Sequence, residues 1–97
     1  MVCDFHPEAQ REMQEAVAYY DTINSILADK FIAEAEFTLN RIEKFPEAWP
    51  KLSANTRRCR ILSFPYGIVY KHSESRILVV AVMHLQRKPN YWIDRSS

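Results

Sequence analysis

Three residues near the end of the chain could build a polar site. His84, Arg87 and Tyr91 place an imidazole, a guanidinium and a phenol within eight residues. Such groups can transfer a proton or hold an anion. They stand at the end of Ile77–Leu85, a nine-residue stretch in which His84 is the only polar residue. We therefore expect a strand to deliver these side chains to one edge of a sheet.

The apolar stretch itself predicts a buried central strand. It is too short to cross a bilayer and too rich in β-branched residues to favour a helix. Pro89 would prevent further pairing beyond it. Side chains alternate along a strand, which predicts one set under a helical layer and the second on an open concave face with His84. The first set is Ile77, Val79, Ala81, Met83 and Leu85, and the second begins with Val80 and Val82.

The first half of the chain predicts a helical hairpin. Pro7 suits a first helical position, and apolar residues then recur every three or four residues to about Leu27. Ala28–Lys30 reads as a break with Asp29 as the cap of the next helix. The apolar stripe resumes at Ile32 and stops at Phe45, before Pro46. So short a link requires the two helices to lie nearly antiparallel.

The rest of the chain predicts a small sheet. A loop around Trp49, which we expect to plug the end of the core, leads to strands at 57–62, 68–72 and 76–85. Their short connections indicate an antiparallel meander. A brief first strand is possible within residues 1–5, and residues 89–95 could form a final helical turn. The fold class is α+β, with a helical hairpin on a small twisted antiparallel sheet, in one domain spanning residues 1–97.

Composition narrows the class of protein. Residues 1–50 carry ten acidic and four basic side chains, a charge of −6, whereas residues 51–97 carry nine basic and two acidic ones, a charge of +7. The basic half could face a phosphate backbone or an acidic protein, or the two halves could neutralise each other. Two cysteines, Cys3 and Cys59, give neither a disulfide framework nor a metal-ligand spacing. We expect a cytoplasmic protein without cofactor, metal or membrane segment.

The order of these elements resembles the RelE/ParE superfamily of bacterial toxins. The resemblance is carried by Arg57 to Tyr70 (Arg-Arg-x-x-Ile-Leu-x-Phe-Pro-Tyr-x-Ile-x-Tyr) and by Ala81 to Trp92 (Ala-Val-x-His-x-x-Arg-x-Pro-x-Tyr-Trp). Members are the toxic halves of type II toxin–antitoxin modules, often described as plasmid stabilisation proteins. The resemblance implies growth inhibition and a cognate antitoxin whose flexible segment wraps the toxin in a hetero-oligomer.

Two cellular targets occur within this superfamily. ParE-like members poison DNA gyrase and need no catalytic set, whereas RelE-like members are ribosome-dependent endonucleases that cut mRNA. In the second case His84 could be the base or acid and Tyr91 the acid or a stacking platform, with Arg60 and Arg87 as phosphate clamps. The net charge of +1 favours gyrase, because RNA binding depends on releasing counterions. An inactive relative that only binds its antitoxin is a third hypothesis.

Structural roles compete with each of these assignments. His84 could satisfy a backbone carbonyl, and Arg87 could pair with Asp94 or with an acidic antitoxin tail. Tyr91 and Trp92 could seat a C-terminal turn. Cys59 stands between arginines, which could lower the pKa of its thiol, but the absence of a neighbouring histidine argues against a nucleophile.

Overall fold

The helical hairpin forms as predicted, although its break lies earlier. The computed structural model describes residues 2–88 and 90–95. Helix α1 spans Pro7–Ile23 and helix α2 spans Ser25–Lys44, joined by Asn24 alone. The Asn24 side-chain oxygen accepts from the Ile26 N–H at 2.7 Å, and the Asn24 N–H donates to the Tyr20 carbonyl at 2.9 Å. One residue thus caps both helices, so the predicted break at Ala28–Lys30 with Asp29 as cap is wrong.

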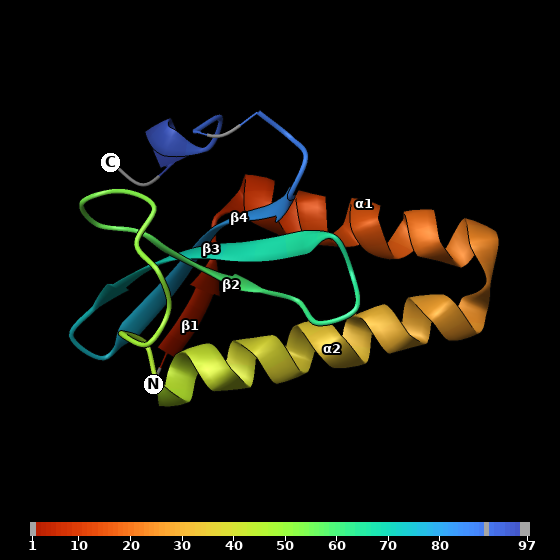
Figure 1. The fold of residues 1–97 in the computed structure, drawn as a ribbon, viewed down its shortest axis with the longest axis horizontal. Helices are drawn as coiled ribbons and strands as arrows, with labels where there is room; N and C mark the ends of the chain where they lie inside the picture. The colour runs from red at the N-terminus through yellow and green to blue at the C-terminus, as the bar shows by residue number, and fades with distance from the viewer. Residues whose placement is uncertain (1, 89, 96–97) are drawn as a thin grey trace.

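A four-stranded mixed sheet packs against the hairpin (Figure 1). The strands are β1 (Val2–Phe5), β2 (Arg57–Arg60), β3 (Tyr66–Ser73) and β4 (Arg76–His84), in the order β1-β4-β3-β2. The meander of β2, β3 and β4 is antiparallel, and β4 is internal, as predicted. Strand β1 instead pairs parallel to β4. The predicted α+β fold with a helical hairpin on a small sheet is confirmed, and the sheet is mixed rather than antiparallel throughout because β1 joins it in parallel.

The core lies on both faces of the sheet. The helix-facing side packs α1 and α2 on the sheet around the fully buried side chains of Phe31, Ile42, Ile68 and Tyr70. On the other face Val69, Val80, Ala81 and Met83 pack beneath Trp92, which is 1% exposed. Trp92 precedes the short 3-10 helix η1 (Ile93–Arg95). The C-terminal segment therefore covers the face that the alternation pattern had left open. Pro89 lies outside the described residues.

A β-bulge in β4 overturns the predicted alternation. Tyr70 pairs with Val79 and Val69 pairs with Ala81, which leaves Val80 as an extra residue. Val80 and Ala81 both join the core under Trp92, and the faces are exchanged from there on. Val82 therefore packs toward the helices and Met83 away from them, the reverse of the prediction. His84 consequently lies on the helix side of the sheet, against the Tyr66 ring.

A buried carboxylate satisfies the strand edge beside this bulge. Glu12 of α1 is 8% exposed and accepts from the Val82 N–H at 3.0 Å and from the Arg95 guanidinium at 3.0 Å. The same guanidinium donates to the Val80 carbonyl at 3.2 Å. Strand β1 ends at Phe5, opposite Val79, so these backbone groups have no strand beside them. Glu12 and Arg95 supply the missing hydrogen bonds and fasten both α1 and the C-terminal segment to β4.

Replacing Glu12 by alanine should destabilise the fold strongly. The change leaves the buried Val82 N–H and the Arg95 guanidinium without their acceptor, a loss of about 3 kcal/mol in the free energy of unfolding. Urea unfolding followed by circular dichroism measures it. The matched control is Glu15→Ala, one turn along the same helix at an exposed position, which should change stability by about 0.5 kcal/mol or less. Equal losses in the two variants would contradict the role assigned to Glu12.

Stability should also fall at alkaline pH through Tyr70. Burial raises the pKa of its phenol to about 12, and its hydroxyl donates to the Pro46 carbonyl at 2.5 Å. Because the folded-state pKa lies above the unfolded value of about 10, this contribution is complete below about pH 10 and is lost as the pH rises to about 12.

The variant Tyr70→Phe isolates this contribution from the other tyrosines. Its free energy of unfolding should be lower than that of the unchanged protein by about 1 kcal/mol at neutral pH, for one lost hydrogen bond. The gap should close as both proteins are titrated past about pH 10. A gap that stays constant across this range would show that Tyr70 does not titrate with unfolding.

Candidate functional site

The structure joins Arg87 and Tyr91 into one cluster. The Arg87 guanidinium lies 3.6 Å from the centre of the Tyr91 ring and 3.5 Å from the Glu12 carboxylate. The Arg95 guanidinium lies 5.1 Å from the same ring centre. Burial and the Glu12 carboxylate, in that order, raise the pKa of the Tyr91 phenol. At neutral pH the Tyr91 phenol therefore keeps its proton, and the Arg87 guanidinium already has an acidic partner.

His84 has different surroundings from this cluster. Its ring packs edge-on against Tyr66 with 5.2 Å between ring centres, and its Nδ1 accepts from the Gln86 N–H at 3.1 Å. That bond places the proton of the neutral ring on Nε2. The ring borders a hollow of about 300 Å3 whose other walls are Tyr19, Tyr20, Ile23, Pro65 and Tyr66. Aromatic packing thus replaces the carbonyl partner that the sequence suggested for His84.

Arg60 belongs to a third location, at the outer edge of the sheet. It is exposed and lines a hollow of about 280 Å3 together with Arg41, Arg58 and the Trp49 ring. The Arg41 guanidinium stacks 4.5 Å from the Trp49 ring centre. Trp49 is half-buried and packs against the helix-facing core, as predicted. The proposed catalytic residues Arg60, His84, Arg87 and Tyr91 are thereby divided among three environments, of which only one holds two of them.

Neither cysteine has the lowered pKa that is typical of a nucleophilic thiol. Cys59 is 2% exposed, and burial raises the pKa of its thiol although the nearby Arg41 acts to lower it. The lowered pKa considered from the sequence is therefore wrong, because desolvation outweighs the arginine. Burial also raises the pKa of Cys3, and both thiols are free. Within residues 2–88 and 90–95, the structure holds no group of three or more side chains able to share a metal ion.

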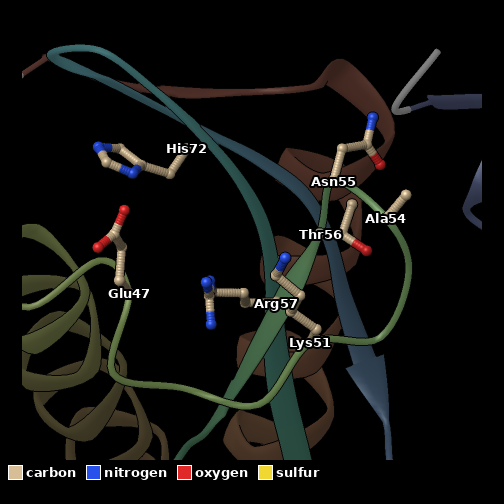
Figure 2. Close-up of a pocket in the computed structure, with 7 residues that line it drawn as sticks. All are labelled: Glu47, Lys51, Ala54, Asn55, Thr56, Arg57 and His72. Atoms are coloured by element: carbon tan, nitrogen blue, oxygen red, sulfur yellow. The ribbon is translucent and has the colours of Figure 1, made fainter.

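A polar hollow lies at the opposite end of β3 from His84 (Figure 2). It is bordered by three basic or imidazole side chains, Lys51, Arg57 and His72, and by the Glu47 carboxylate. The remaining walls are Ala54, Asn55 and Thr56. Lys71, His72 and Arg76 lie on either side of the turn between β3 and β4. Sequence reasoning missed this hollow because loop residues and strand residues meet in it.

Glu12 and Arg95 are the other residues that sequence reasoning missed. A signal for Glu12 was present, since it stands three residues after Ala9 and four before Ala16, on the buried stripe of α1. A charged residue at such a position requires a buried partner. Arg95 gave no comparable signal, because its role depends on where the C-terminal segment folds back.

Each helix in the described part of the chain is too short or too polar to span a bilayer.

Comparison with curated protein sequences finds no match. Among solved structures, the chain is similar to one described as "Chromosomal ParDE TA system from P. aeruginosa". The two are 10% identical, with a TM-score of 0.69, covering 89% of this chain and 97% of that one. At that identity the likeness establishes a shared fold.

The family comparison extends over most of the sequence. Residues 3–89 match the family described as "ParE toxin of type II toxin-antitoxin system, parDE". The matched region contains both helices and all four strands apart from the first residue of β1. With the shared fold, this match places the chain in the ParE toxin family of type II toxin–antitoxin systems.

Proposed function

We propose that this ParE-family toxin arrests growth by poisoning DNA gyrase, and that a cognate antitoxin holds it inactive in the cytoplasm. The observation that carries the proposal is the match of residues 3–89 to the ParE family. Resemblance to this family implies gyrase as the target. This mechanism requires a protein–protein contact and no chemistry by the toxin itself. The net charge of +1 is consistent with it.

The surface of the hairpin supports a protein partner. Its two helices expose several large apolar side chains, namely Tyr19, Ile23, Ile26, Ile32 and Phe37, at 38–76% of their full areas. The turn end of the hairpin projects past the sheet (Figure 1). Apolar surface gathered on one element is typical of a docking site. An amphipathic antitoxin segment laid across these helices would cover it.

The arrangement of the basic residues gives less support to RNA cleavage. A metal-free nuclease needs an acid, a base and cations around one phosphate. Arg87 is engaged by Glu12 and Tyr91, while His84 and Arg60 border separate hollows. The ribosome-dependent endonuclease and the inactive homologue are therefore the competing outcomes of the experiments below.

Inducing the toxin without its antitoxin should stop growth and break DNA while leaving mRNA whole. A gyrase poison traps the enzyme on cleaved DNA, which activates DNA-damage signalling. Growth, a damage-response reporter and the length of abundant transcripts are measured in one culture, with co-expressed antitoxin as the control. Shortened transcripts before any DNA damage would indicate the endonuclease. Unimpaired growth at full expression would indicate an inactive homologue.

Substitution of the proposed catalytic residues should leave the arrest intact. Arg60→Ala and His84→Ala each remove a group that the nuclease hypothesis requires, and Arg60 is exposed, so its loss leaves the core unchanged. We expect growth arrest within about twofold of that caused by the unchanged toxin, because neither group carries chemistry in a gyrase poison. Expression and antitoxin binding verify folding. Loss of arrest in both folded variants would refute the gyrase proposal.

A further inference from the structure

The polar hollow beside β3 is organised by a closed loop. The Leu52 N–H donates to the Thr56 carbonyl at 2.9 Å, and Lys51 pairs with Arg57 as an isolated antiparallel bridge. Thr56 is 1% exposed, and its hydroxyl lies 2.6 Å from the Ser53 hydroxyl. These bonds hold Lys51 beside the first residue of β2. Two cationic side chains, Lys51 and Arg57, thus border the same space.

The cationic wall has hydrogen-bond donors available. The Arg57 guanidinium donates from Nη1 to the Trp49 carbonyl at 2.8 Å, which fixes its plane. A guanidinium has five N–H donors, so four others are not used by this bond. Figure 2 shows Arg57 extending toward the side where Glu47 lies. Lys51 is exposed and adds up to three donors of its own. This wall is therefore suited to an oxyanion.

The opposite wall carries hydrogen-bond acceptors. The Glu47 carboxylate lies next to the His72 ring in Figure 2. The His72 Nε2 lies 2.9 Å from the Glu74 carbonyl and donates to it, which fixes the ring at the edge of the hollow. A carboxylate would repel a fully deprotonated oxyanion. It would attract one that carries a proton, because the hydroxyl of that anion can donate to it.

The size of the hollow limits what can enter. Its volume is about 150 Å3. One water molecule occupies roughly 30 Å3, so a tetrahedral oxyanion with a few waters fits. With Lys51 and Arg57 against Glu47, the three charged side chains sum to +1. The space therefore favours a small anion over a cation or an apolar group.

We propose that the hollow bordered by Glu47, Lys51, Arg57 and His72 binds a protonated phosphate group, either free phosphate or the end of a phosphomonoester. Lys51 and Arg57 donate to the unprotonated oxygens, and the Glu47 carboxylate accepts from the phosphate hydroxyl. The site is separate from the exposed apolar side chains of the hairpin that were proposed to bind the antitoxin. Its existence does not depend on the toxin's target.

Titration with phosphate and with sulfate tests this assignment. Spectra of the full chain are recorded by NMR at about pH 6, near the second pKa of a phosphate group, at constant ionic strength. Phosphate should shift the backbone amides of residues 51–57 and 72, with an affinity at least about fivefold higher than that for sulfate, which has no proton to donate. Equal affinities for the two anions would overturn the proposal.

Three substitutions locate the site and separate its two walls. Lys51→Gln should weaken binding of both anions by about tenfold. Lys30→Gln removes the same charge from an exposed position near the hairpin turn and should change binding by about twofold or less. Glu47→Gln should erase the preference for phosphate over sulfate, because it removes the carboxylate that attracts the protonated anion and repels the unprotonated one. All three positions are exposed, so the variants should fold.

Other phosphate compounds identify the natural source. Phenyl phosphate, a monoester with a titratable hydroxyl, should bind like inorganic phosphate if the end of a larger molecule can enter. If inorganic phosphate binds and phenyl phosphate does not, the site is restricted to the free anion. Dimethyl phosphate, a diester without that hydroxyl, should bind as weakly as sulfate. Tight binding of the diester, or equal weakening by Lys51→Gln and Lys30→Gln, would refute the proton-dependent site.

Discussion

The buried carboxylate of Glu12 is the interaction on which the rest of the structure depends. It connects three segments that are far apart in the sequence: α1, the bulged part of β4, and the C-terminal turn. Each of these contacts satisfies a polar group that is buried or mostly buried, so the cost of losing one is high. The same contact determines the surroundings of Arg87 and Tyr91. Glu12 was not among the proposed catalytic residues, yet it fixes the geometry of two that were, Arg87 and Tyr91.

The bulge in β4 also determines the positions of several distant side chains. One extra residue, Val80, rotates the rest of the strand by half a period and directs His84 toward the aromatic side chains of α1. The same irregularity leaves the Val80 carbonyl and Val82 N–H for Arg95 and Glu12. The packing of the sheet and the distribution of the polar residues therefore have one origin. Moving His84 toward Arg87 would require repairing the bulge and rebuilding both cores.

Much of the fold could be predicted from local patterns. The apolar periodicity of residues 9–45 indicated two helices, and the run of β-branched residues from Ile77 indicated the internal strand. The break at Asn24 was misplaced because the apolar stripe continues across it, while the cap chemistry lies in a single amide. The parallel pairing of β1 was missed because four residues carry too little pattern to specify a partner.

The candidate site was less predictable because strict alternation cannot reveal a bulge. All residues from Ile77 to Met83 are apolar, so no polar position marked the change of face. The burial of Glu12 could have been noticed from its spacing in α1. Its partner Arg95 could not, since that contact spans 83 residues of sequence. The polar hollow at Lys51 and His72 likewise depends on tertiary proximity alone.

The single-residue link at Asn24 has a mechanical consequence. With both helix ends satisfied by one side chain and one N–H, the hairpin has no slack segment that could act as a hinge. The paired helices behave as a stiff rod whose tip stands at a constant distance from the sheet. A protein that contacts both the hairpin tip and the sheet must have binding surfaces that match this distance.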